Sequence, residues 1–238
     1  GRWKLRDVVL LLGALVALYA LVWVLPAMIG PEAFRSRGFT LAERLMTEAR
    51  VMFLYLELIF YPGLMKFSLY HDDFIVSHSL LEPASTLWAI VALVVITFLV
   101  LVWFKRFPML LFAWGWFIIA HLLESTVFSL ELIHEHRNYF ATLGFALLAP
   151  VAIFSLPARY RWGGSMLVLV FLALSVFVTT NRAIIWSNLV DQAAFEAEIK
   201  PNSDRANYEL GRVYLRLLEQ TGEQKYAELA KQSFNKAV

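Results

Sequence analysis

Residues 86–104 read TLWAIVALVVITFLVLVWF, an apolar stretch without a single charged side chain. An α-helix needs roughly 20 such residues to cross about 30 Å of hydrocarbon, and about 17 residues is the lower limit. The stretch therefore predicts a helix that spans a lipid bilayer.

Four further apolar stretches resemble it, at residues 8–29, 108–123, 139–156 and 165–180. Each meets or approaches the length of a membrane span, and none has a charge in its middle. The chain is also 60% hydrophobic and only 17% charged, whereas a soluble domain averages roughly 25% charged residues. The predicted fold class is an all-α polytopic membrane helix bundle with about five spans.

Composition excludes several other classes of protein. The first stretch is too long for a signal peptide, and no small-residue cleavage site follows it. The absence of cysteine excludes disulfides, thiolate metal sites and a cysteine nucleophile. The net charge of the chain is only +2, and the basic residues gather at the ends of the predicted helices. No nucleic-acid partner is therefore expected.

Basic residues form three clusters beside the apolar stretches. They are Arg2, Lys4 and Arg6; Lys105 and Arg106; and Arg159 and Arg161. Lys and Arg in short loops mark the cytoplasmic face of a membrane protein. If all three clusters are cytoplasmic, residues 30–85, 124–138 and the tail after residue 180 lie on the other side. This predicts an integral membrane protein whose tail lies outside the cytoplasm.

This topology requires that residues 40–66 do not span the bilayer. Thr40 and Glu43 have the spacing of a capping box, which predicts a helix from there to about Phe60. Its polar positions lie opposite its apolar ones, which favours a helix in the membrane interface. The polar set is Glu43, Thr47, Arg50 and Glu57, and the apolar set is Leu41, Leu45, Met52, Leu56 and Ile59. The alternative, a sixth span, would divide the basic clusters between the two faces.

The tail has a different composition, which divides the chain into a transmembrane domain (1–180) and an extracytoplasmic region (181–238). Residues 181–200 predict an amphipathic helix. Residues 210–214 (LGRVY) fit the first helix of a TPR repeat, and Ala230, Phe234 and Ala237 fit the second. A helical hairpin of another kind remains open, because the turn around residues 220–222 is long. Since a lone repeat cannot bury its apolar face, we expect a longer protein or a protein partner.

Two extracytoplasmic loops concentrate polar residues, at 68–74 and 121–139. Three interpretations remain open for them. His71, Asp72, Asp73, His134 and His136 could bind a divalent cation, although no H-E-x-x-H spacing is present. Alternatively, Asp72 or Asp73 could act as a general base, with Arg137 holding a lipid phosphate. The third is a structural polar cluster, with Arg137 paired to Glu131 or Glu135 and one aspartate capping a helix.

The order of these elements resembles a known family. It comprises Tyr-x-Asp-Asp-Phe, a long span, Lys-Arg-Phe-Pro, a span ending in Glu-Ser-Thr, residues 135–139 (EHRNY), two more spans and the TPR-like tail. Across roughly residues 5–238 the chain is similar to the C-terminal membrane half of bacterial multispanning TPR proteins. These resemble the transmembrane-and-TPR O-mannosyltransferases of the GT-C glycosyltransferase superfamily. Four residues fit the family's E-R-x-x-Y-x-P-S-x-G-F stretch: Glu135, Tyr139, Gly144 and Phe145. Two depart from it: His136 stands at its Arg and Ala141 at its Pro.

The resemblance implies a bacterial inner-membrane protein with its tail in the periplasm, a polyprenyl-phosphate sugar donor and sugar transfer on the extracytoplasmic side. Asp72 or Asp73 would then be catalytic. The substrate-binding residues would be Tyr70, His71, Glu135, His136, Arg137, Asn138 and Tyr139. The family's catalytic acid usually lies in an earlier loop that has no counterpart here. Two functions therefore remain open: part of a glycosyltransferase whose N-terminal catalytic half is missing from this chain, or a non-catalytic membrane anchor whose TPR surface binds a protein partner in a larger complex.

Overall fold

The computed structural model describes residues 5–237 except 25, 28, 29, 36 and 123, and for residues 5–11, 20 and 31 it describes only the backbone. The regular secondary structure of the described residues is entirely helical, which confirms the predicted all-α class. In chain order the elements are α1 (Leu5–Tyr19), the π-helix η1 (Ala20–Val24), α3 (Pro31–Phe34), α4 (Leu41–Phe60), α5 (Ser85–Val102), α6 (Pro108–Leu122), the 3₁₀-helix η2 (Glu135–Arg137), α7 (Asn138–Ser155), α8 (Ala158–Trp186), α9 (Leu189–Ile199), α10 (Asp204–Thr221) and α11 (Gln224–Lys236).

Three helices are long and apolar enough to cross a membrane: α5, the run Glu135–Ser155 that includes α7, and α8. The rest of the chain covers little of their surface, and only 6% of the most apolar part of α8 is buried. Continuous apolar surfaces of this extent are rare on proteins in water. The three helices therefore indicate association with a membrane.

The two other predicted spans are shorter in the structure. Helix α6 has 15 residues, fewer than the roughly 17 that a span requires. The predicted span at residues 8–29 is divided between α1 and η1, and its residues 25, 28 and 29 lie outside the described residues. The count of five spans therefore stays a prediction.

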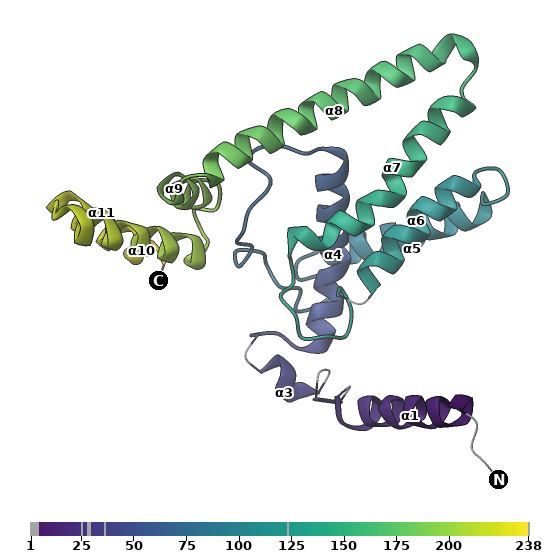
Figure 1. Ribbon diagram of the computed structural model, residues 1–238, viewed down its shortest axis with the longest axis horizontal. Helices are drawn as coiled ribbons and strands as arrows, with labels where there is room; N and C mark the ends of the chain where they lie inside the picture. The colour runs from purple at the N-terminus through teal and green to yellow at the C-terminus, as the bar shows by residue number, and fades with distance from the viewer. Residues whose placement is uncertain (1–4, 25, 28–29, 36, 123, 238) are drawn as a thin grey trace.

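The basic turns lie together at one end of the helix bundle. Figure 1 shows the α5–α6 turn, which carries Lys105 and Arg106, on the same side as the α7–α8 turn, next to Arg159 and Arg161. The long loops and helices α9–α11 lie at the opposite end. Of the third cluster, Arg2, Lys4 and the side chain of Arg6 lie outside the described residues.

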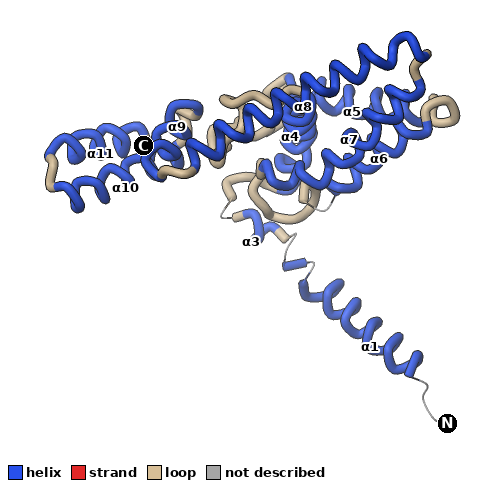
Figure 2. Tube along the Cα trace, turned by 45° about the horizontal axis from the view of Figure 1, so that its top comes forward, coloured by secondary structure: helices blue, strands red, loops and turns tan. Residues whose placement is uncertain are grey.

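Helix α4 starts at the predicted capping box. The Thr40 side chain accepts a hydrogen bond from the Glu43 N–H at 3.3 Å, and the Glu43 carboxylate accepts one from the Thr40 N–H at 2.7 Å. In Figures 1 and 2, α4 crosses the direction of α5 and α6. It supplies much of the core, which is formed by Val51, Met52, Tyr55, Leu58, Ile59, Val100, Trp114, Phe117, Ile133 and Ala141.

The buried face of α4 differs from the predicted one. Thr47 was expected among water-facing residues but is fully buried, whereas Leu45, expected on the apolar face, is 44% exposed. Arg44 and Glu48 are buried as well. The reason is that the segment 124–130 lies along this half of the helix and supplies hydrogen-bond acceptors to Arg44. A distant loop thus makes burial of polar side chains possible here.

Helix α8 continues to Trp186, beyond residue 180, where the last predicted span ends. The single amphipathic helix predicted for residues 181–200 is wrong, since the chain breaks at Ser187 and Asn188. The Asn188 side chain then accepts the Val190 N–H at 2.9 Å and starts α9. Asparagine is a favoured helix N-cap because it satisfies one of the free N–H groups at the helix start.

Helices α10 and α11 form a tight antiparallel hairpin at the C-terminal end (Figure 2). A Cβ on Gly211 would lie 2.7 Å from the ring of Phe234. Ala206 and Ala230 are almost completely buried, and the ring of Tyr208 lies 5.5 Å from that of Phe234. The hairpin thus has small residues where the helices approach and aromatic residues beside them.

We expect Gly211→Ala to destabilise the hairpin by about 1–2 kcal/mol, because the new methyl group would displace the Phe234 ring. Gly115→Ala is the matched control: it also lies inside a helix, and its Cβ would meet nothing within 4 Å. Hydrogen exchange of α10 and α11 in detergent measures the effect. Equal protection in the two variants would contradict the close packing.

Candidate functional site

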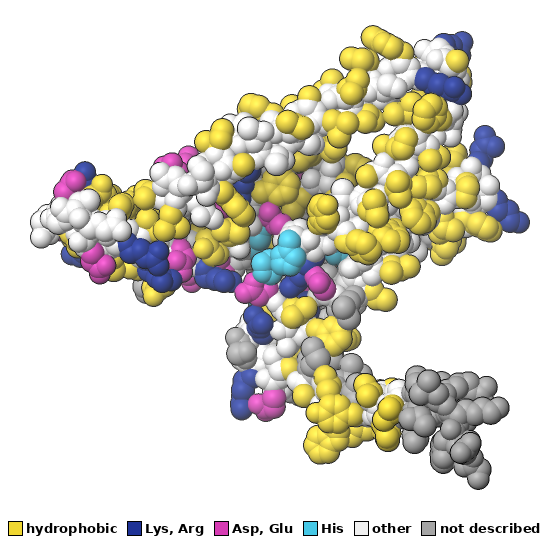
Figure 3. Space-filling model, viewed as in Figure 1, with side chains coloured by type: hydrophobic (Ala, Val, Ile, Leu, Met, Phe, Trp, Pro, Cys, Tyr) yellow, Lys and Arg dark blue, Asp and Glu magenta, His cyan; other side chains and the backbone are white. Residues whose placement is uncertain are grey.

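Charged and histidine side chains gather where the long loops meet the tail (Figure 3). The loop 61–84 and the segment 124–137 come from the helix bundle, and α9 and α10 approach them from the other side. Most of the predicted site residues lie in this region. We call it the loop–tail cluster; it comprises Ser68–Asp73, Glu131–Asn138, Arg182, Glu196, Lys200, Ser203 and Arg205.

Asp72 caps the start of α10. Its carboxylate accepts hydrogen bonds from the Ser203 hydroxyl at 2.5 Å and from the Arg205 N–H at 3.1 Å. Burial by itself raises the pKa of Asp72. The hydrogen bonds lower it by more than burial raises it, so the pKa lies below its usual value. A carboxylate held in this way favours its ionised form and is a weak proton acceptor.

The neighbouring residues also contact the tail. Both carboxylate oxygens of Asp73 lie close to the Lys200 ammonium, at 3.1 and 3.2 Å. The Arg205 guanidinium lies 5.6 Å from the centre of the Tyr70 ring. Tyr70, Asp72 and Asp73 of one loop therefore contact the linker before α10 and its first turn.

Glu196 on α9 is a buried contact that the sequence did not reveal. Its carboxylate is 1% exposed and accepts hydrogen bonds from the Ser68 hydroxyl at 2.7 Å and from the Leu69 N–H at 3.0 Å. Its other oxygen lies 3.0 Å from Arg182. The guanidinium of Arg182 also lies beside the rings of Trp186 and Phe195. This one carboxylate joins α8, α9 and the loop.

Two of the sequence elements in the family resemblance, Tyr-x-Asp-Asp-Phe and residues 135–139, contact each other. Glu135 accepts the Ser68 N–H at 2.6 Å, and the same oxygen lies 3.0 Å from Nε2 of His71. Only His71 and Glu135 of the predicted substrate-binding residues are paired with one another in this way. The contact joins the loop 61–84 to the start of α7.

The remaining predicted residues have separate surroundings. Arg137 pairs with the Glu124 carboxylate at 2.9 Å and donates to the backbone oxygen of Glu131, so its carboxylate partner is neither of the two expected. Asn138 is buried and donates to the backbone oxygen of Tyr55. The side chains of His136 and Tyr139 are exposed, Tyr139 by 87%. These residues do not converge on one point.

The metal interpretation needs several ligands at one point. Among the side chains that the structure describes, no three of His, Asp or Glu lie close enough together to hold a metal ion. Asp72 and Asp73 instead bind groups of the tail.

A second polar contact lies deeper, between α4 and the segment 124–130. Arg44 is fully buried and donates to the backbone oxygens of Glu124, Thr126 and Leu130. It also lies 2.9 Å from Glu48. Helical periodicity predicted no charged side chain in the core of α4. Arg44 is buried there because its guanidinium donates to backbone oxygens of a distant segment, which satisfies both groups.

Glu48 gives the fold a pH dependence. Burial raises its pKa to about 7, against the opposing effect of Arg44. A carboxyl group whose pKa is higher in the folded state lowers the stability of the fold as the pH rises from its unfolded-state pKa to its folded-state pKa. We therefore expect the free energy of unfolding to fall between about pH 4.5 and pH 7, and Glu48→Gln to reduce this slope. Thermal unfolding of the two proteins in detergent at several pH values measures it, and identical slopes would contradict the assignment.

No known protein family matches this chain, and comparison with curated proteins and with solved structures found no match. Its function must therefore be argued from the geometry and the residue pattern.

Proposed function

We propose that this chain is a membrane anchor that holds a TPR-like helical tail against the bilayer surface, where the tail binds a protein partner. The observation that carries this proposal is that Asp72 and Asp73 bind the tail. Both carboxylates, which the residue pattern suggested as catalytic, bind the linker and first turn of α10.

The chemistry of these contacts favours a clamp over a catalytic base. A general base must reach the proton that it removes from the substrate. Asp72 uses both oxygens on the tail, and Asp73 faces an ammonium group with both of its own. With Glu196 they attach the tail at three places.

The hairpin supplies a surface for the partner. Helical-repeat proteins bind partners along surfaces formed by stacked hairpins, and one hairpin leaves apolar surface uncovered. On α10, Tyr208 is 51% and Leu215 is 40% exposed. Because α9–α11 lie opposite the basic turns, the positive-inside rule supports an extracytoplasmic position for this surface, which in a bacterial inner membrane is the periplasm.

A photo-crosslinking amino acid at Leu215 tests the proposal in cells. We expect one discrete protein adduct, and we expect Asp72→Ala to lower its yield about threefold or more, since loss of a helix cap destabilises by roughly 0.5–2 kcal/mol. Asp191→Ala, which changes an exposed acidic residue at the start of α9, should leave the yield unchanged. The absence of a discrete adduct, or a yield that does not depend on Asp72, would contradict an anchoring role.

The second candidate is part of a GT-C glycosyltransferase that uses a polyprenyl-phosphate sugar. The observation that favours it is the contact between His71 and Glu135, which joins the two elements of the family resemblance. In this case Asp72 or Asp73 would assist the transfer, and His136 with Arg137 would hold the phosphate.

Turnover of a polyprenyl-phosphate sugar by the full-length gene product in lipid nanodiscs distinguishes the two candidates. An enzyme should lose turnover in Asp72→Asn but keep most of it in Ser203→Ala, which weakens the same contact and preserves the carboxylate. An anchor should show no turnover in any variant.

A further inference from the structure

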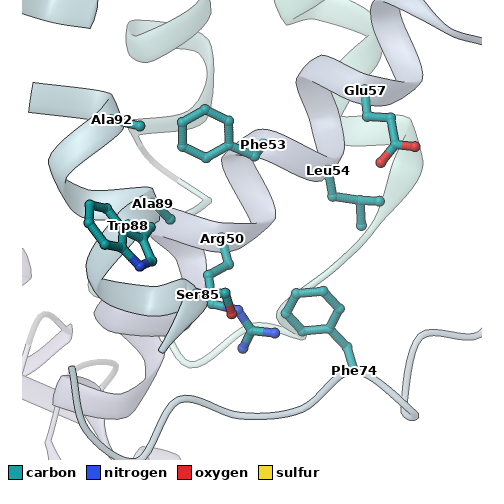
Figure 4. A pocket seen from close by; sticks show the side chains of 9 residues that line it. All are labelled: Arg50, Phe53, Leu54, Glu57, Phe74, Ser85, Trp88, Ala89 and Ala92. Atoms are coloured by element: carbon teal, nitrogen blue, oxygen red, sulfur yellow. The ribbon is translucent and has the colours of Figure 1, made fainter. Parts of the chain in front are cut away.

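An open groove of about 470 Å³ lies between α4 and the first half of α5. Figure 4 shows Phe53 and Leu54 on the α4 side, Trp88 and Ala92 on the α5 side, and Phe74 of the loop 61–84 near one end. None of its lining residues belongs to the loop–tail cluster, although Phe74 directly follows Asp73 in the chain, and none of the proposed functions uses it.

Most of the side chains that line the groove are apolar. Ala89 and Ala92 are one turn apart on α5 and are small, which leaves space beside the helix. Phe53 and Trp88 stand on either side of this space (Figure 4). An apolar groove that is open along its length suits a flexible hydrocarbon chain.

One end of the groove carries a positive charge. The Arg50 guanidinium donates to the backbone oxygen of Ile75 at 2.6 Å and lies 4.7 Å from the centre of the Phe74 ring. No carboxylate among the described side chains lies within 4.0 Å of it. Glu57 also lines the groove, but it pairs with Lys66. Lys66 thus offsets the charge of Glu57, and Arg50 supplies the positive charge at its end of the groove.

The position of the groove relative to the membrane agrees with this polarity. It lies beside the first turns of α5, a helix long enough to span a bilayer. Trp88 is 68% exposed one turn into that helix, and tryptophan at this depth is typical of the headgroup region. Arg50 then meets the headgroup layer while Ala92 faces the acyl chains.

We propose that this groove binds an anionic phospholipid. The headgroup phosphate accepts hydrogen bonds from the N–H groups of Arg50 that donate neither to Ile75 nor to the Ser77 hydroxyl, and one acyl chain lies between Phe53 and Trp88. Arginine suits this role because its planar guanidinium binds phosphate through two parallel hydrogen bonds. The lipid would bridge α4 and α5 on the side that carries the tail.

Native mass spectrometry of the full chain in detergent, titrated with phosphatidylglycerol or phosphatidylcholine, tests the proposal. We expect tighter binding of phosphatidylglycerol, and about a tenfold loss in Arg50→Gln. Arg50→Lys should lose less, because it keeps the charge. Inorganic phosphate in excess should not displace the lipid, because it cannot fill the apolar groove.

Two further variants separate binding from folding. Ala92→Leu fills the groove and leaves Arg50 in place, so it should also weaken binding of phosphatidylglycerol. Arg35→Gln changes an exposed arginine that pairs with Glu32 and should bind like the wild type. Equal affinity of the wild type for the two lipids, or unchanged binding in both Arg50→Gln and Ala92→Leu, would overturn the proposal.

Discussion

Replacing Arg44 with methionine is expected to lower the free energy of unfolding by about 3–5 kcal/mol, the largest effect of any single change considered for this protein. The side chain is fully buried. Its loss would leave the backbone oxygens of Glu124, Thr126 and Leu130 without their donor, and Glu48 without its cation. Unfolding by denaturant in detergent measures the change.

The double variant Arg44→Met/Glu48→Met separates the charge from the packing. Removing both members of a buried ion pair is often far less destabilising than removing one of them, so we expect the double variant to be more stable than Arg44→Met alone. Arg35→Met, at an exposed arginine, is the control and should change stability by less than about 0.5 kcal/mol. A double variant less stable than Arg44→Met would contradict this interpretation.

Glu196→Gln is expected to release the tail from the helix bundle, with a loss of about 3 kcal/mol in its docking free energy. The glutamine would leave Arg182 without its buried carboxylate and would place an N–H₂ group where Ser68 or Leu69 now donates. Hydrogen exchange should rise in α9 and at the start of α10, while α5 and α7 keep their protection.

Glu198→Gln provides the matched control, because Glu198 lies on the same helix and is exposed. It should leave the exchange of the tail unchanged. Faster exchange in both variants, or in neither, would show that the buried carboxylate does not hold the tail in place.

Much of the helical framework could be predicted from local sequence. The capping box at Thr40 and the end of α4 at Phe60 match the expected boundaries, and α5 and α7 lie within a few residues of their predicted stretches. Gly211 and Phe234 were expected in facing helices and are in contact. These features depend on residues close together in the chain, so periodicity and end signals suffice to find them.

Other features could not be predicted in this way. The burial of Arg44 and Glu48 depends on a segment about 80 residues away. The loop residues Asp72 and Asp73 read equally well as catalytic groups or as helix caps, because their partners Ser203 and Lys200 lie more than 100 residues further along the chain. The continuation of α8 to Trp186 was also missed, since polar residues begin before that helix ends.

The amino-acid sequence alone therefore established the all-helical character of this protein, its long apolar helices and its C-terminal hairpin. The length of an apolar stretch and helical periodicity are properties of residues that are close together in the chain. The partners of the acidic loop and of the buried arginine became known only when distant segments were placed together. The role of a carboxylate or a guanidinium depends on the groups that it contacts. Here those contacts join α4 to the segment 124–130, and the loop Ser68–Asp73 to α9 and α10.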